Sequence, residues 1–133
     1  ALIMGASGVQ MGTRFLLAKE CRLHPNAKQA IIDAADTDSV VTGFTTRDTV
    51  RGLRNLFSEK YLKLEYSGAA QSELTALAAG TNRKAVIDGD TENGFVLAGM
   101  SLTHLTKIQP VQEIVEELVS ETERRLAAAP KLI

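Results

Sequence analysis

Gly12 and Thr13 are the residues in this chain whose types and spacing could bind an anion. Glycine lets a ligand approach the backbone closely, and threonine adds a hydroxyl donor. Residues 8–12 are expected to form a short strand, and the helix-forming run at 14–20 follows it. That order turns backbone N–H groups toward a phosphate. A glycine that only eases a tight turn is the alternative, because short glycine motifs are unspecific.

The two histidines and the single cysteine do not form a metal-ligand or nucleophile pattern. His24 precedes a proline at an expected helix start, which favours a structural or surface role. His104 follows a glycine-rich apolar stretch and could face a cleft, although a lone histidine more often has a structural role. Cys21 has no CxxC partner. We therefore predict no metal site.

Two groups of charged residues have functional and structural interpretations. The acidic residues of DGDTE at 88–92 do not match a calcium loop and are expected to form a solvated turn. Arg47, Arg51 and Arg54 have roughly helical spacing, which would gather their charge on one side. Such a group could attract an anionic substrate or carrier, and pairing with local acids is the alternative.

The composition describes one domain of a soluble protein. The chain has 133 residues, of which 44% are hydrophobic and 23% charged, and its net charge is −1. No whole-chain field therefore recruits nucleic acid or anionic lipid. No apolar run reaches the roughly 18 residues of a membrane span. One cysteine fits a reducing, cytoplasmic compartment. Because residue 1 is not methionine and starts an apolar run, we expect a fragment or processed chain.

The pattern along the chain predicts mixed α and β structure. Residues 1–5 are typical of a final helical turn, with Gly5 as a left-handed cap. Further expected elements are a helix at 26–35 after Pro25, a strand at 38–46, helices at 58–68 and 69–80, and a helix at 110–129. Residues 47–57 fit neither pattern well.

The last helix has the clearest pattern. Its apolar side chains recur at helical spacing: Val111, Ile114, Val115, Leu118, Val119 and Leu126, with Thr122 on the same side. Pro110 fits the first helical position, and glutamates precede Arg124 and Arg125, as the helix dipole favours. We predict an amphipathic helix packed on a larger apolar surface.

Four segments in order resemble one known family. They are GASGVQMGTRFLLAKECRLHPNAKQAII, DTDSVVTG, RKAVIDGDTENGFVLAG and the closing PVQEIVEEL. Together they resemble FMN-dependent nitronate monooxygenases, also called 2-nitropropane dioxygenases, and look closest to the related flavin-containing enoyl-acyl-carrier-protein reductase II. The resemblance covers essentially the whole chain and does not separate the two activities.

The resemblance implies an α/β fold, namely the C-terminal fragment of a TIM-type (β/α)8 barrel. A complete barrel needs about 250 residues. Residues 1–23 would hold the last barrel strand and the FMN phosphate-binding segment. Residues 24–105 would form an inserted, mostly helical α+β subdomain on the substrate side. Residues 106–133 would form the closing helix, which packs on the outside of the barrel.

The resemblance also assigns site residues. Gln10, Met11, Gly12 and Thr13 would hold the FMN phosphate, mostly through backbone N–H groups. Gly99, Met100 and His104 would lie at the active-site mouth, where the family commonly has Gly-Gln in place of Gly99-Met100. The family's catalytic histidine belongs to the N-terminal half, so no catalytic residue is expected in this fragment. Alone, the chain is predicted to be inactive.

The function expected from the resemblance is that of an FMN-dependent oxidoreductase with NAD(P)H as electron donor. The substrate would be an enoyl thioester or an alkyl nitronate. Expected partners are the missing N-terminal barrel half and, as an option, a second copy in a homodimer; nucleic acid and membrane are not expected. The alternatives are a non-catalytic α+β binding or interaction module, and a flavin reductase or storage protein with no specific substrate.

Overall fold

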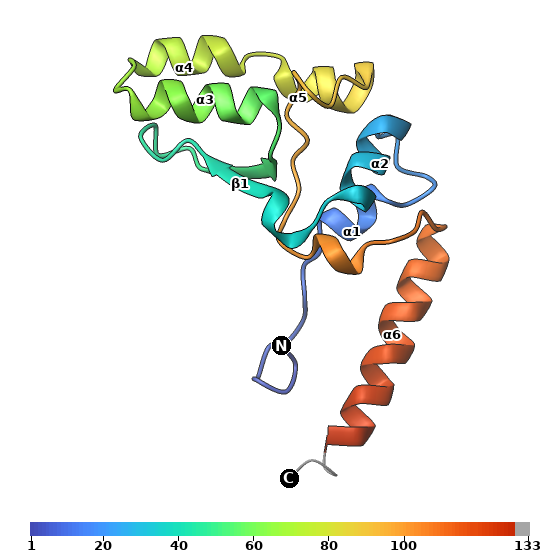
Figure 1. Ribbon diagram of the computed structural model, residues 1–133. Coiled ribbons are helices and arrows are strands. Elements are labelled where there is room, and N and C mark those ends of the chain that lie inside the picture. Colours follow the sequence, from blue (N-terminus) through green and yellow to red (C-terminus); the bar gives the residue numbers. More distant parts are fainter. Residues whose placement is uncertain (130–133) are drawn as a thin grey trace. The chain divides into compact units, whose positions relative to one another are not determined.

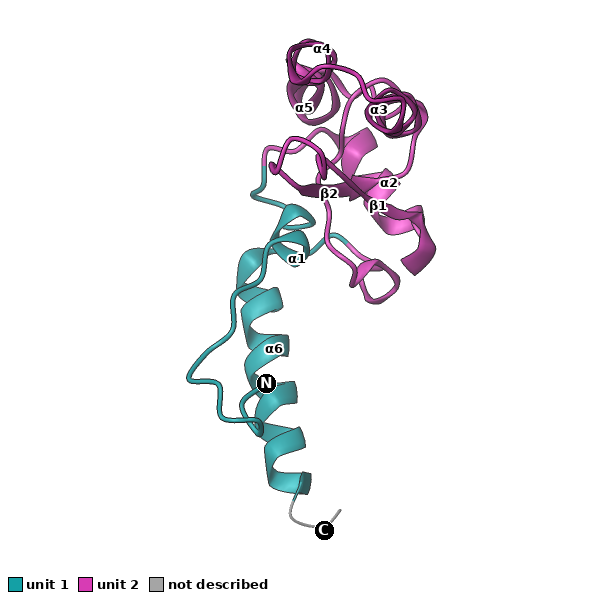
Figure 2. Cartoon of the chain, turned by 90° about the vertical axis from the view of Figure 1, so that its left-hand side faces the viewer, with its two compact units in different colours: residues 1–21, 108–133 teal, residues 22–107 magenta. Residues whose placement is uncertain are grey.

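The computed structural model describes residues 1–129, which divide into two units (Figure 2). Unit 1 combines residues 1–21 with the chain from Ile108 onward, and unit 2 is Arg22–Lys107. The elements of unit 1 are α1 (Thr13–Leu16) and α6 (Val111–Ala128). The elements of unit 2 are α2 (Pro25–Asp33), η1 (Asp36–Asp38), β1 (Ser39–Thr42), β2 (Val50–Leu53), α3 (Leu56–Tyr66), α4 (Gln71–Ala78), α5 (Thr81–Arg83), the π-helical turn η2 (Lys84–Asp88) and η3 (Leu102–His104), as Figure 1 shows.

Unit 2 is built on the antiparallel hairpin of β1 and β2, in which Ser39 pairs with Leu53 and Thr42 with Val50. Residues 95–98 extend it, because the Leu53 amide donates to the Val96 carbonyl at 2.9 Å. Gly52 permits this approach: a Cβ there would lie 2.5 Å from the Phe95 ring and 2.6 Å from the Val96 oxygen. The expected strand at 38–46 is thus confirmed in its first half, and the ambiguous 47–57 segment contains β2 and the start of α3.

The hydrophobic core of unit 2 lies between α3, α4 and the segment that follows η2. Phe57 and Tyr61 of α3, Leu74 of α4, and Phe95 are buried together. The three rings pack in tilted pairs, with centroids 5.3 Å apart for Phe57–Phe95 and 5.9 Å apart for Phe57–Tyr61. The two helices run side by side (Figure 1). This confirms the two helices that the sequence predicts at 58–68 and 69–80.

Glu65 of α3 holds the turn after β1 although it is a carboxylate inside the unit. Its side chain is almost fully buried. Its oxygens accept hydrogen bonds from the Gly43 amide at 3.2 Å, the Thr45 amide at 2.9 Å and the Thr45 hydroxyl at 3.1 Å. Three donors offset much of the cost of burying the charge. The β1–β2 turn is therefore fixed against α3.

The start of α2 is fixed by His24, which confirms its structural interpretation. The Nδ1 atom of His24 accepts from the Asn26 amide at 3.1 Å, so the imidazole caps the helix, and Pro25 occupies the first turn. The His24 amide donates to the Val86 carbonyl at 2.9 Å, and the Asn26 side chain donates to the Gly89 carbonyl at 3.1 Å. The predicted helix after Pro25 is confirmed.

In unit 1, the segment after α1 is hydrogen-bonded to the start of α6. The Lys19 amide donates to the Gln109 carbonyl at 2.8 Å, and the Gln109 amide donates to the Leu17 carbonyl at 3.2 Å. Both carboxylate oxygens of Glu20 accept from the Val111 amide, at 3.0 and 3.2 Å. A carboxylate from another segment thus satisfies a first-turn amide of α6.

The predicted last helix is confirmed as α6, with Pro110 at the N-cap position rather than inside the first turn. Its apolar residues are only partly covered in the described structure. Ile114 is fully buried, whereas Val115, Val119 and Leu126 are 43%, 52% and 39% exposed. The larger apolar surface that the pattern predicts is thus not supplied by residues 1–129.

Two predictions near the N-terminus are wrong in part. Residues 8–12 form no strand, because a strand needs a neighbouring ladder and none of the described residues pairs with them. The helix expected at 14–20 is the four-residue α1. The cap at Gly5 is confirmed: its φ is +94°, and the Gly5 and Ala6 amides donate to the Leu2 and Ala1 carbonyls at 2.9 and 3.1 Å. This is the Schellman pattern, here closing a single turn.

Substitution of Gly89 by alanine is expected to destabilise unit 2 more than the same change at Gly80. Both glycines have left-handed backbone, with φ of +75° and +74°. A Cβ at Gly89 would overlap the His24 imidazole, whereas one at Gly80 meets no atom within 4 Å. Urea unfolding should show a loss of about 1 kcal/mol for Gly80→Ala and about 3 kcal/mol for Gly89→Ala. Equal losses would contradict the overlap with His24.

Candidate functional site

The expected phosphate-binding segment, Gln10 to Thr13, presents an accessible backbone in unit 1. Gln10, Met11 and Gly12 are exposed and Thr13 is half-buried. Gly12 is the N-cap residue of α1, and no side chain caps the helix there. A Cβ at Gly12 would meet no atom within 4 Å. Among residues 1–129, nothing accepts a hydrogen bond from the Met11 or Gly12 amide.

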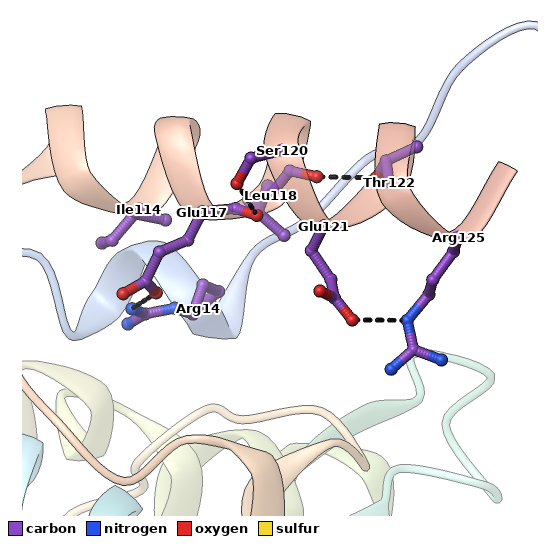
Figure 3. Close-up of a pocket in the computed structure, with 8 residues that line it drawn as sticks. All are labelled: Arg14, Ile114, Glu117, Leu118, Ser120, Glu121, Thr122 and Arg125. Carbon is purple, nitrogen blue, oxygen red and sulfur yellow. Dashed lines mark hydrogen bonds and ion pairs between the residues drawn. The ribbon is translucent and has the colours of Figure 1, made fainter. Parts of the chain in front are cut away.

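Arg14, the cation next to this segment, is paired with residues at and just before α6. Its guanidinium donates to the Gln109 side chain and lies 4.0 Å from the Glu117 carboxylate, as Figure 3 shows for Glu117. Gln109 in turn donates to Glu117 at 2.7 Å. The Arg14 side chain is only 15% exposed. Its charge therefore fixes α1 on α6, and it leaves the backbone of Gly12 as the accessible feature.

Arg14 and Glu117 also border a cavity of about 470 Å³ between α1 and α6 (Figure 3). Its other charged residues also pair with each other, since Arg125 donates to the Glu121 carboxylate at 2.6 Å. Hydrogen bonds from Arg124 and Arg125 lower the pKa of Glu121, and those from Arg124 contribute more. This cavity has no uncommitted charge on the described side chains that line it, and none of residues 10–13 borders it.

The expected mouth residues Gly99, Met100 and His104 lie in unit 2. Met100 is 67% exposed, and His104 is the exposed last residue of η3. Their segment is attached to η1, because Asp36 accepts from the Thr103 hydroxyl at 2.9 Å and from the Thr103 amide at 3.3 Å. The structure thus brings these three residues onto one tethered segment of unit 2.

The helical grouping expected for Arg47, Arg51 and Arg54 is wrong, because this part of the chain is a turn and a strand. Arg51 lies on β2, Arg47 lies in the preceding turn with a φ of +60°, and Arg54 follows the strand. Positions three apart, such as 51 and 54, share a side in a helix but face opposite sides of an extended chain, and Arg47 lies outside the strand. Arg51 donates to the Ser39 hydroxyl at 3.0 Å, which uses it within the hairpin.

The remaining candidates have structural roles. The Asp90 carboxylate accepts hydrogen bonds from the Asn93 backbone amide at 2.9 Å, from the Asn93 side-chain amide at 3.1 Å and from the Glu92 backbone amide at 3.3 Å. These bonds lower the pKa of Asp90, and those from Asn93 contribute most. They also form the expected solvated turn. Cys21 is free and half-buried. Residues 1–129 contain no group of three acidic, histidine or cysteine side chains suited to a metal ion, and none of their helices is long and apolar enough to span a bilayer.

Comparison with known proteins identifies the family. Residues 1–121 match the family model described as nitronate monooxygenase. The chain belongs to the nitronate monooxygenase family. A probable nitronate monooxygenase of Bacillus subtilis is 28% identical over 121 residues, covering 91% of this chain and 35% of the relative. One from Staphylococcus haemolyticus is 30% identical over 124 residues, covering 93% and 34%. The chain therefore spans about a third of the length of these relatives.

The solved structure of FabK from Thermotoga maritima is similar over 99% of this chain and 42% of its own, with a TM-score of 0.92 and 32% identity. A structure of a single-residue variant of that FabK aligns with a TM-score of 0.80. The family predicted from the four sequence segments is thus confirmed, and so is the α/β fold class.

Replacing Asp36 by alanine is expected to release the segment that carries Met100 and His104. The change removes the acceptor for both Thr103 bonds, while an exposed position costs little global stability. The heteronuclear NOE of residues 100–105 should fall, with the unfolding midpoint nearly unchanged. The matched control is Asp33→Ala, which removes only a bond to Gln29 within α2. An unchanged NOE in Asp36→Ala would show that the segment is held by other contacts.

Proposed function

We propose that this chain is the C-terminal portion of an FMN-dependent oxidoreductase that uses NAD(P)H. The observation that carries the proposal is the accessible backbone at Gly12, in a chain of the nitronate monooxygenase family. The leading substrate is an enoyl thioester, supported by the likeness to FabK at a TM-score of 0.92. An alkyl nitronate is the second candidate, because the relatives from Bacillus and Staphylococcus are named probable nitronate monooxygenases.

The residues at 10–13 fit the phosphate of FMN. The Met11 and Gly12 amides are exposed and have no acceptor among the described residues, and Thr13 adds a hydroxyl beside them. The open space at Gly12 lets an anion reach these donors without displacing a side chain. Gln10 to Thr13 would therefore hold the phosphate. Bound FMN would supply the acceptance and delivery of hydride, which no side chain can provide.

We infer that residues 1–23 contribute the last strand of a (β/α)8 barrel and residues 106–133 its closing helix, with 24–105 as the inserted subdomain. Support comes from the half-exposed apolar face of α6 and from exposed apolar residues near the N-terminus. These are Leu2, Ile3, Met4, Val9, Val111, Val115, Val119 and Leu126. Further barrel strands and helices would cover this surface. They would also pair with residues 8–12, which have no ladder partner among residues 1–129.

The segment at Met100 favours the acyl substrate. Met100 exposes an apolar thioether where family members commonly have a glutamine, so it offers no hydrogen-bond donor and suits a hydrocarbon chain. With His104 and Gly99, it would form the mouth of the site. A cytoplasmic location and a homodimer belong to the same proposal.

Gly12→Asp in the complete enzyme is expected to release most of the FMN. The aspartate places a carboxylate beside the phosphate, and like charges at that distance repel strongly where water is excluded. Gly12→Asn has nearly the same size without the charge and serves as the control. Flavin absorbance after gel filtration measures occupancy. The Asn variant should retain clearly more FMN than the Asp variant, and full occupancy in Gly12→Asp would refute phosphate binding here.

The reaction itself is tested by anaerobic NAD(P)H consumption with an enoyl thioester, and by oxygen-dependent turnover of an alkyl nitronate. The complete enzyme is expected to oxidise NAD(P)H with the enoyl thioester while oxygen is absent. Turnover of the nitronate alone would select the second candidate. A flavin-loaded protein that turns over neither would contradict both.

A further inference from the structure

Unit 2 contains a cavity of about 330 Å³ between the β1–β2 hairpin, α3 and α4, which we call the Thr42 cavity. It is bordered by residues from positions 42 to 95, so it lies within one unit. None of Gly99, Met100 and His104 lines it, nor does any residue of 10–13. The proposed FMN and substrate roles therefore leave this cavity without an assigned use. Its size is in the range of small-molecule sites.

Aromatic side chains make up half of the apolar residues that line the cavity. Phe57, Tyr61 and Phe95 all border it. The sequence has four phenylalanines, two tyrosines and no tryptophan, so this one cavity takes three of the six aromatic residues. The rings are tilted to each other by 53° and 54° and are held in the core. Such a wall offers offset or edge contacts to a flat ring.

The polar part of the wall has uncommitted hydrogen-bonding groups. Thr42 is only 2% exposed, yet its hydroxyl makes no hydrogen bond to any described residue. Every fully buried side-chain oxygen or nitrogen of the described residues has a hydrogen-bond partner. Because the Thr42 hydroxyl has none, its oxygen is not fully buried and touches open space. The cavity that Thr42 lines supplies that space. The Thr42 hydroxyl is shielded from water except where it faces the cavity. It could therefore donate a hydrogen bond to a ligand there or accept one from it.

Three side chains nearer the surface extend this polar wall: Asp48, Gln71 and Thr75. None of them forms a side-chain hydrogen bond within residues 1–129. Among the described residues that line the cavity, Asp48 alone is charged. Its carboxylate favours a hydrogen-bond donor or a cation and disfavours an anion.

The cavity wall is fixed before any ligand binds. Glu65 holds the Gly43 and Thr45 amides, and Thr46, the next residue, lines the cavity and donates to the Gly43 carbonyl at 3.1 Å. Thr81, which also lines the cavity, donates to the Ala78 carbonyl at 2.8 Å. A preformed wall lowers the entropic cost of binding.

We propose that the Thr42 cavity is a binding site for a small aromatic or heteroaromatic compound that carries an amide, amine or hydroxyl donor and no negative charge. The ring packs on Phe57, Tyr61 and Phe95. The donor group of a neutral ligand meets the Thr42 hydroxyl, and that of a cationic ligand meets the Asp48 carboxylate. The site is additional to the FMN and substrate sites.

The test uses three probes of one shape and different charge: benzamide, benzamidine and benzoate. Saturation-transfer NMR with the whole protein is expected to show binding of the first two at millimolar concentration, with benzoate at least about tenfold weaker. Thr42→Val keeps the volume and removes the hydroxyl, and it should weaken benzamide about fivefold. Absence of binding, equal binding of benzoate, or unchanged benzamide affinity in Thr42→Val would overturn the proposed ligand class.

A matched pair of α4 variants locates the binding. Thr75 is exposed and lines the cavity, so Thr75→Trp should fill it and abolish the signal. Ser72 is exposed on the same helix and does not line the cavity, so Ser72→Trp should leave binding unchanged. If Thr75→Trp unfolds, Ala79→Phe replaces it, because Ala79 is also exposed and borders the cavity. Binding that survives the filled cavity would overturn the proposal.

Discussion

The hydrogen bonds of Gln109 hold together the part of unit 1 on which the proposed cofactor site depends. Its backbone bonds to Leu17 and Lys19, and its side chain contacts both Arg14 and Glu117. These bonds hold the Arg14 guanidinium against Gln109 and Glu117, so the preceding residues would meet the proposed ligand with backbone rather than with a cation. The side chain is almost completely buried, which makes each bond costly to lose. In the proposed function, the amides at Gly12 would therefore bind the phosphate.

Unit 2 depends on polar anchors of the same kind. Glu65 fixes the β1–β2 turn, and Asn55 both caps α3 and donates to the Thr91 and Gly94 carbonyls at 2.6 Å. The two anchors lie at opposite ends of α3 and hold loops that a hairpin of two short strands cannot position alone. The Glu65 anchor lies next to the Thr42 cavity, whereas the segment with Met100 is held separately by the bonds between Thr103 and Asp36.

Local patterns predicted α2, α3, α4 and α6 and the turn at Gly5, whereas they did not predict the long-range contacts. The spacing of Ile114 and its neighbours identified α6, and Gly5 identified the first turn. The strand expected at 8–12 failed because pairing partners, not propensity, make a strand. The buried roles of Glu65 and Gln109 have no sequence signal, since each looks like a solvated polar residue. In the candidate site, composition and turn chemistry pointed to Gly12 and Thr13 alone; the other site residues came from the family resemblance.

The most direct test of phosphate binding at Gly12 is a crystal structure of the complete enzyme loaded with FMN. The structure presented here predicts phosphate oxygens within about 3 Å of the Met11 or Gly12 amide nitrogen, with Arg14 still on Gln109. A phosphate bound elsewhere, with those two amides hydrogen-bonded to protein atoms instead, would contradict it.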